Sequence, residues 1–275
     1  MPKKFVDEVL ENQNEDLISK LGINLEIEIA AKYYKKCLQN HLTYYIKIFT
    51  SDMNNFKNNI SKNVSIFFDG YAHDFSSIYK EDTKKRSSFD KLMDNWFRKG
   101  IEERFSKTIS KTNKNSIKSV LDIGCGPGHF VVEFLKQGKK ITALDIAPSM
   151  LEITKKRVQA MNKEEEVKFI LEDYLNYRPD QKFDAACVMG FFDYVEDPVK
   201  VLKKLLKDVE KEIYISVPDN RGILAFQRKI RYKLRNCPLF LYSKEYLVES
   251  LKAAGCFEIS EIDEMDRGYF VTIKK

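Results

Sequence analysis

The stretch that decides the fold is Val120-Leu-Asp-Ile-Gly-Cys-Gly-Pro-Gly128, an apolar run that passes directly into a glycine-rich turn. Glycines at 124, 126 and 128 let the backbone turn sharply and let a ligand approach it closely. The following residues, 129–138, have a helical pattern, and the first N–H groups of a helix lack partners within it. The run therefore predicts a strand, a nucleotide-binding turn and a helix.

A carboxylate at the end of the next predicted strand strengthens this interpretation. The strand covers 140–145 and ends in Asp145, 21 residues after Gly124. An acidic residue at about that distance can bind the two hydroxyl groups of a ribose. The dinucleotide pattern would place its third glycine at position 129, where His129 stands. The spacing therefore disfavours a dinucleotide.

These motifs resemble those of the class I methyltransferases that use S-adenosylmethionine (SAM). The resemblance rests on four segments in order, 122–128, 144–151, 171–173 and 183–190, and covers roughly residues 65 to 275. It implies an α/β, Rossmann-like fold whose mostly parallel, seven-stranded sheet has an antiparallel C-terminal strand. It also implies SAM as the cofactor and S-adenosylhomocysteine (SAH) as the product.

The alternation of apolar and amphipathic segments predicts the order of strands and helices. Strands are expected near 117–123, 140–145, 167–171, 183–189 and 212–217, with helices over about 129–138, 149–161 and 198–208. Such alternation indicates a parallel sheet covered on both faces. A helix near 243–254 and a final antiparallel hairpin, with strands near 256–262 and 269–273, complete the chain.

Two further parts are expected before the glycine loop. Residues 1–64 predict a helical extension, with a polar linker or exposed loop between Ser51 and Ser65. Residues 65–115 contain an aromatic segment that resembles the N-terminal lid of quinone-biosynthesis and magnesium-protoporphyrin methyltransferases, and then a helix over 89–109. Residues 116–275 form the predicted SAM-binding domain.

The resemblance implies a set of cofactor contacts. Asp122 would orient the glycine loop and reach the methionine amino group, while Asp145 would bind the ribose. Ile146 and Met150 would enclose the adenine, unless they are core residues. Asp173 and a neighbouring backbone amide, with Tyr174 as the neighbour, would read the adenine amino group, unless Asp173 is a solvated loop carboxylate. The full predicted set is Asp122, Gly124, Cys125, Gly126, Gly128, Asp145, Ile146, Met150, Asp173, Tyr174 and Met189.

Candidate catalytic residues come from two places. Asp193 and Tyr194 follow the fourth strand, where ligands sit in open α/β sheets. Many related enzymes carry a histidine there, and this chain does not. Tyr71 and His73 belong to the lid segment, where they are either catalytic or part of an aromatic packing cluster. Methyl transfer needs alignment and exclusion of water, and a general base only helps a hydroxyl acceptor.

A basic segment from Arg221 to Arg235 contains no acidic residue and follows the fifth strand. It predicts a substrate side that attracts a carboxylate, a phosphate or a nucleic-acid backbone. The alternative is the solvated face of an amphipathic helix. The predicted substrate-binding residues are Phe192, Arg221, Arg231 and Arg235.

Composition narrows the class of protein. The 275 residues include 43% hydrophobic and 32% charged residues and carry a net charge of +6, values that are ordinary for a soluble globular protein. Neither a signal peptide nor a long apolar run is recognised, so a cytosolic location is expected. The five cysteines and three histidines are spaced unlike a zinc site or a disulfide framework, and no metal is expected.

These features together predict a SAM-dependent methyltransferase acting on a small anionic or aromatic molecule, with oxygen as the methylated atom. The alternative among enzymes is an RNA methyltransferase, which the basic segment supports. No Asn-Pro-Pro-Tyr type motif follows the fourth strand, and this weakens the RNA alternative. A SAM-binding regulator or partner subunit without turnover is the alternative from a different class.

Overall fold

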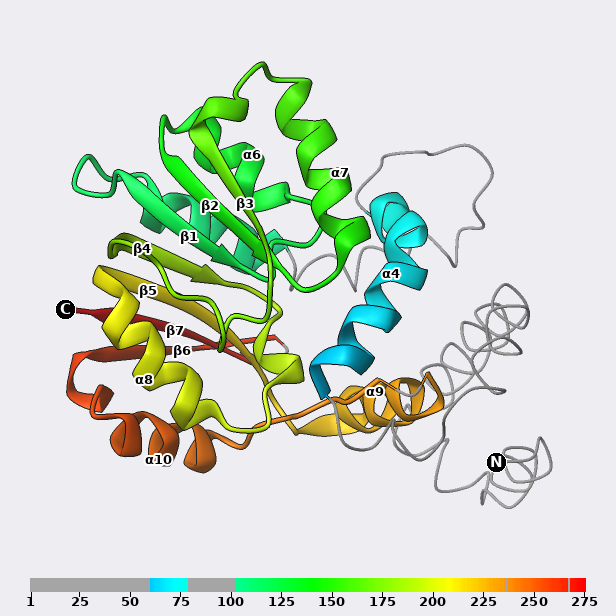
Figure 1. The fold of residues 1–275 in the computed structure, drawn as a ribbon. Helices are drawn as coiled ribbons and strands as arrows, with labels where there is room; N and C mark the ends of the chain where they lie inside the picture. Colours follow the sequence, from blue (N-terminus) through cyan, green and yellow to red (C-terminus); the bar gives the residue numbers. More distant parts are fainter. Residues whose placement is uncertain (1–59, 79–101, 236, 267) are drawn as a thin grey trace, which may run out of the picture. The chain divides into compact units, whose positions relative to one another are not determined.

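The structure is a computed structural model that describes residues 60–78, 102–235, 237–266 and 268–275 (Figure 1). The chain divides into two compact units, Met1–Asp52 and Met53–Lys275, and all described residues belong to the second. The helical extension expected before residue 60 and the start of the helix expected over 89–109 lie outside the described residues. The domain boundaries after residues 64 and 115 stay predictions.

A seven-stranded sheet in the order β3-β2-β1-β4-β5-β7-β6 forms the centre of the described chain. The parallel strands are β1 (Ser119–Ile123), β2 (Lys140–Asp145), β3 (Val167–Leu171), β4 (Phe183–Val188) and β5 (Val209–Pro218). β7 (Gly268–Lys274) is antiparallel to both β5 and β6 (Ser260–Met265). The predicted mostly parallel sheet with its antiparallel C-terminal strand is confirmed.

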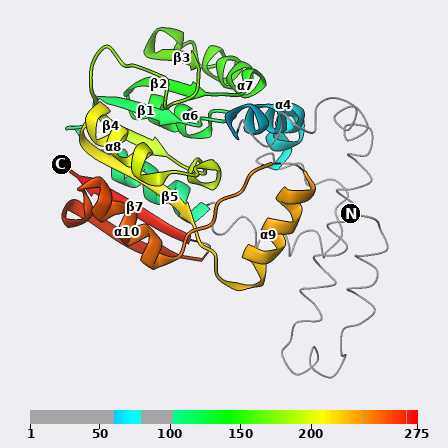
Figure 2. The ribbon, with the colours of Figure 1, turned by 60° about the horizontal axis from the view of Figure 1, so that its bottom comes forward.

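Helices cover both faces of this sheet. The helices that follow the strands are α6 (His129–Lys136), α7 (Pro148–Gln159), α8 (Pro198–Asp208), α9 (Gly222–Leu234) and α10 (Lys244–Ala254). α8 and α10 lie side by side on one face, and α6 and α7 lie on the other (Figures 1 and 2). No helix among the described residues is long and apolar enough to cross a membrane.

The core consists of two main clusters, one on each face. In β1, Leu121 and Ile123 join the cluster that contains residues of α8 and α10, and Val120 joins the cluster that contains residues of α6 and α7. Successive side chains of a strand point to opposite faces, so a strand covered on both faces is apolar throughout. This explains why the run before the glycine loop shows no polar alternation.

The linker expected between Ser51 and Ser65 is wrong over its last part, because helix α4 (Ile60–Ile78) begins at Ile60. Serine and asparagine favour loops, since their side chains compete for backbone hydrogen bonds. Here Asn63 and Val64 are each only 8% exposed. Tertiary contacts override the local preference, and α4 runs beside α7 in both views (Figures 1 and 2).

The strand expected from residue 256 begins later, at Ser260. Gly255 ends α10 in the left-handed conformation, and the short 3-10 helix η4 (Phe257–Ile259) follows. The chain needs this extra turn to reverse from the helix into the sheet. The other predicted strands and helices between 117 and 254 lie within three residues of their observed ends.

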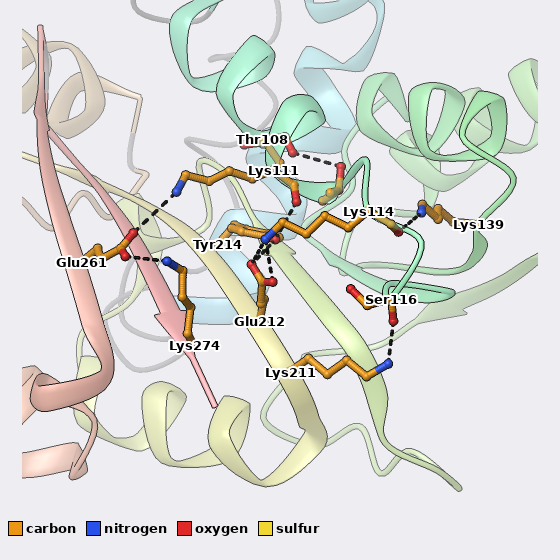
Figure 3. Close-up of polar contacts among 11 residues, drawn as sticks. Thr108, Lys111, Lys114, Ser116, Lys139, Lys211, Glu212, Tyr214, Glu261 and Lys274 are labelled. Atoms are coloured by element: carbon orange, nitrogen blue, oxygen red, sulfur yellow. Dashed lines mark hydrogen bonds and ion pairs between the residues drawn. The ribbon is translucent and has the colours of Figure 1, made fainter.

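Polar contacts connect the sheet to the segment before β1 at the amino ends of the strands (Figure 3). The Lys114 ammonium lies 2.6 and 2.7 Å from the two oxygens of Glu212, which also accepts a hydrogen bond from Tyr214 at 2.7 Å. Lys139 donates to the backbone oxygens of Lys114 and Ile117, both at 2.7 Å. This edge is opposite the glycine loop, and these contacts hold the segment before β1 against the sheet.

Candidate active site

The glycine loop lies between β1 and α6, at the carboxyl end of β1. Gly124, Gly126 and Gly128 have positive φ angles of 69°, 54° and 80°. The N–H groups of Gly124 and Cys125 donate to the carbonyl of Leu144, which holds the loop against β2. A Cβ atom placed on Gly126 would meet nothing within 4 Å. The loop therefore leaves open space beside its backbone, as a bound cofactor requires.

Gly128→Ala is expected to lower the free energy of unfolding by about 2 to 3 kcal/mol. A Cβ atom at this position would lie 2.6 Å from Cγ2 of Thr154, and the residue also needs a positive φ. Gly138→Ala is the matched control, because Gly138 has a φ of 71° but an open Cβ position. Urea unfolding should show a larger loss for Gly128→Ala, and equal losses would contradict the steric argument.

Asp145 ends β2 and is 7% exposed. One carboxylate oxygen accepts the N–H of Gly126 at 2.8 Å, and the other accepts the N–H of Ala147 at 2.9 Å. Burial raises the pKa of Asp145, and these hydrogen bonds oppose the shift. Each carboxylate oxygen retains a second lone pair. The side chain can therefore hold the glycine loop and still accept hydrogen bonds from a ribose.

Asp122 is a buried carboxylate on β1, opposite Cys187 of β4 in the strand register. Its Oδ2 atom is buried and has no hydrogen-bond partner. Burial raises the pKa of Asp122 to about 7, and a hydrogen bond with the Cys187 side chain partly offsets this. A buried polar atom without a partner is costly. A cationic ligand group, such as the ammonium of an amino acid, would complete this site.

Asp122→Asn should change the pH dependence of stability. The folded-state pKa of about 7 lies above the ordinary value of 3.8, so the folded chain binds an extra proton between these values. The contribution of Asp122 to stability is therefore fully present at acid pH and is lost as the pH rises through about 7. Relative to the parent, the variant should gain at most about 1.4 kcal/mol per pH unit between roughly pH 5 and pH 7. Denaturant unfolding at several pH values tests this, and a pH-independent difference would contradict it.

Asp173 follows β3 and is held on both of its oxygens. One accepts the N–H of Leu175 at 2.9 Å, and the other accepts the hydroxyl of Ser61 from α4. Ser65, also on α4, donates to the carbonyl of Ile146 at 3.0 Å. α4 therefore contacts the loops after β2 and β3, where the sequence predicts the adenine.

Three further predicted cofactor residues contribute little exposed side chain. Met150 is 1% exposed and packs with Ala147, and this supports its alternative as a core residue. Cys125 is 5% exposed, so mainly its backbone belongs to the loop surface. Met189 is partly buried after β4, and its sulfur accepts a hydrogen bond from Thr108 at 3.5 Å. Their contact with a cofactor stays a prediction.

The predicted substrate contact of Phe192 needs correction, because its side chain is 0% exposed, and the side chain of Tyr174 is 1% exposed. The Tyr174 hydroxyl donates to Asp208 of α8 at 3.1 Å, and Phe192 belongs to the main core. The predicted role of Tyr174 beside Asp173 uses its backbone amide, and this role stays a prediction. The ring beside the glycine loop is Phe191, 3.4 Å from a Cβ placed on Gly124. A Phe-Phe pair in the sequence does not show which ring points inward.

An aromatic cluster joins α4, the short helix η3 (Phe192–Tyr194) and α9. The ring of Phe68 lies 5.3 Å from that of Tyr194, and the ring of Phe67 lies 5.7 Å from that of Tyr232. The hydroxyl oxygens of Tyr194 and Tyr232 are 3.1 Å apart. The sequence gives no signal that Phe67, Phe68 and Tyr232 belong together, because only the fold brings their segments into contact.

Asp193 forms an ion pair with Arg228 of α9. The carboxylate is 6% exposed, so the pair is largely withdrawn from water. Burial is the largest single effect on Arg228 and opposes its charge, but attraction to Asp193, Tyr232 and Tyr194 together outweighs burial and raises the pKa of the guanidinium. Burial also raises the pKa of Tyr194 well above its ordinary value. Neither predicted catalytic residue is therefore placed as a ready proton acceptor.

The basic segment forms helix α9, and acidic residues of other elements face part of it. Arg221 pairs with Asp219 at 3.2 Å and with Glu264 at 3.7 Å, so a dedicated substrate role is not favoured. The guanidinium of Arg235 lies 6.0 Å from the ring centre of Phe67, beside the aromatic cluster. The side chain of Arg231 lies outside the described residues, as do those of Tyr71 and His73 on α4. Among the described residues, no group of acidic, histidine or cysteine side chains is arranged to hold a metal.

Comparison with known proteins places this geometry in a family. Residues 120–211 match the family model described as a methyltransferase domain. The chain is 29% identical over 139 residues to malonyl-[acyl-carrier protein] O-methyltransferase 1 of Ilyobacter polytropus, covering 47% of each chain. It is 25% identical to a ubiquinone biosynthesis O-methyltransferase of Pasteurella multocida, covering 62% of this chain and 74% of that one. The chain thus spans about half the length of the first relative.

A solved structure shows the same fold over most of the chain. Magnesium protoporphyrin IX methyltransferase of Synechocystis PCC 6803, with bound SAH, superposes with a TM-score of 0.62 at 14% identity. The match covers 79% of this chain and 100% of that one. Residues 120–211 are a methyltransferase domain, and the described sheet has the class I fold. The Asp122 oxygen without a partner and the open space at Gly126 fit the charged and bulky parts of SAM.

Proposed function

We propose that the chain transfers the methyl group of SAM to an oxygen atom of a small aromatic or anionic acceptor. The observation that carries this proposal is the aromatic cluster of Phe67, Phe68, Tyr194 and Tyr232. It includes η3, which follows β4 at the carboxyl end of the sheet, where ligands of open α/β folds bind. Aromatic rings provide a surface for a planar acceptor, and Arg235 lies beside this surface.

In the proposed mechanism, one end of the site binds the cofactor and the other end binds the acceptor. When bound, SAM supplies an electrophilic methyl group on a positively charged sulfur. Asp122 and the glycine loop would hold the amino-acid part, and Asp145 would hold the ribose. The aromatic cluster would exclude water and align the acceptor for in-line displacement. No covalent bond to the protein is needed.

The ion pairing and burial of the candidate bases limit which kind of acceptor the site can methylate. Asp193 is committed to Arg228, and burial raises the pKa of Tyr194. A general base works best when its pKa lies near the working pH. The described residues therefore suit an acceptor oxygen that is already ionised near neutral pH, such as a carboxylic acid or a phenol with electron-withdrawing substituents. The relatives, both named O-methyltransferases, support oxygen as the methylated atom.

The RNA alternative has less support. Its main argument is the basic segment, but Arg221 and Arg228 of that segment form ion pairs with carboxylates of this chain. A phosphate backbone would have to compete with these intramolecular partners. A regulator that binds SAM without turnover is distinguished only by activity.

The deciding experiment offers methyl-labelled SAM to the chain together with separated cell fractions of small molecules, lipids and glycans, RNA and protein. A catechol acid and an aliphatic carboxylic acid serve as defined acceptors. Label in a small molecule would support the proposal, and mild alkali would release it from an ester but not from an aryl ether. Label confined to RNA would support the alternative. SAH binding without transfer to any fraction would favour the regulator.

A further inference from the structure

Helix α4 carries a stripe of three polar residues, Ser61, Ser65 and Asp69, on one face. They are four residues apart, so they lie one turn above another. Each contacts a different part of the predicted adenosine site. Ser61 donates to the carboxylate of Asp173, and Ser65 donates to the carbonyl of Ile146 at 3.0 Å. Over two turns of α4, the stripe therefore contacts the loops where the cofactor is predicted to bind.

Asp69 completes the start of α7. The N-cap residue of α7 is Ala147, whose side chain accepts no hydrogen bond, and Pro148 follows it. Asp69 accepts the N–H of Ser149 at 3.0 Å and its hydroxyl at 2.6 Å. An N-cap side chain normally makes the first of these bonds. α4 thus supplies the missing cap from 80 positions away in the sequence, which ties α4 to the helix that follows the ribose carboxylate.

Ser61 determines which hydrogen-bonding groups are available to a ligand at the end of β3. With the N–H of Leu175 on one oxygen and the Ser61 hydroxyl on the other, the carboxylate of Asp173 is held in one orientation. Ser61 has donated its only hydroxyl proton, so its remaining capacity is to accept. The pair therefore presents hydrogen-bond acceptors and no donor. Such a surface suits an exocyclic amino group and disfavours a carbonyl.

We infer that Ser61 is a positioning residue that sets the preference of the site for the 6-amino group of adenine, acting through Asp173. Ser65 and Asp69 hold α4 in place for this role. The inference rests on the proposed function, because it assumes that the cofactor occupies the site beside Asp145. It assigns part of cofactor recognition to a helix that lies outside the matched methyltransferase domain of residues 120–211.

The test compares two ligands by titration calorimetry on the full chain. One is SAH, and the other is the SAH analogue that has hydrogen in place of the 6-amino group. The parent should prefer SAH. Ser61→Ala should weaken SAH about threefold to tenfold, since one hydrogen bond to a charged group loses its orientation, and should leave the analogue unchanged. The preference for SAH therefore falls, while Ser61→Thr, which keeps a hydroxyl, should restore it.

Two matched variants separate this role from a structural one. Ser106→Ala removes a hydroxyl that bonds only to Glu103 of its own helix, and should change neither ligand. Ser65→Ala should lower the preference for SAH less than Ser61→Ala does, because α4 loses one contact with Ile146 while Ser61 keeps its hydroxyl beside Asp173. Equal weakening of both ligands by Ser61→Ala would overturn the inference, as would no change. Failure of the parent to bind SAH at all would overturn the proposed function and this inference with it.

Discussion

Asp145→Ala is expected to weaken SAH binding by about 30- to 150-fold, or about 2 to 3 kcal/mol. The variant loses the predicted acceptor of the ribose hydroxyls. It also releases the N–H groups of Gly126 and Ala147, so the glycine loop loses the bond that holds its central glycine. Titration calorimetry with SAH measures the loss. Unchanged affinity would refute the assignment of Asp145 to the ribose.

Asp184 provides a matched control for this experiment. One of its carboxylate oxygens accepts the N–H groups of Lys118 and Ser119, at 2.7 and 3.0 Å, at the opposite edge of the sheet. Asp184→Ala therefore also releases two backbone donors, but none that faces the cofactor. It should lower stability and leave the affinity for SAH unchanged. A similar loss of affinity in both variants would mean that Asp145 acts only through folding.

Arg228→Met is expected to lower the free energy of unfolding by about 3 kcal/mol. Its partner Asp193 is 6% exposed, so the variant leaves a carboxylate buried without its cation. Methionine keeps much of the apolar length of arginine, which limits the change to the charge. Urea unfolding at neutral pH measures the effect, and a loss below about 1 kcal/mol would mean that water already compensates Asp193.

The double variant Asp193→Leu with Arg228→Met tests the origin of that loss. Removing both charges avoids an unpaired buried ion, so the double variant should be more stable than Arg228→Met alone. Losses that simply add would mean that the two side chains contribute independently. Recovery of stability with reduced methyl transfer would show that the pair positions α9 for the acceptor, beyond its effect on folding.

Local sequence features were sufficient to predict the sheet and the cofactor loop. Strand β2, strand β3 and helix α8 lie where the pattern of apolar residues predicts them. The glycines at 124, 126 and 128 adopt the positive φ angles that only glycine adopts easily. These features depend on neighbours along the chain, so a pattern of nearby residues is enough to predict them.

The last part of the linker predicted before residue 65 was wrong, because its residues from Ile60 onward belong to α4 and are placed by distant contacts. Serine and asparagine in that segment favour a loop locally, but Ser61 bonds to Asp173, 112 positions away. Two further features could not be predicted from the sequence. One is which ring of the Phe191 and Phe192 pair points into the core, and the other is that the Tyr174 side chain points away from the cofactor side. Each was decided by which side chain fits the core against α8 and the strands.

The sequence by itself determined the class I fold, the glycine loop and the strand-end carboxylates Asp122 and Asp145. Their positions follow from residue periodicity and from the glycines that a sharp turn requires. Only the tertiary structure decided which groups meet at the proposed acceptor side, where α4, η3 and α9 come together. Side chains that are distant in the sequence pair there because burial leaves a polar or charged group few partners, and the fold selects which partner is within reach.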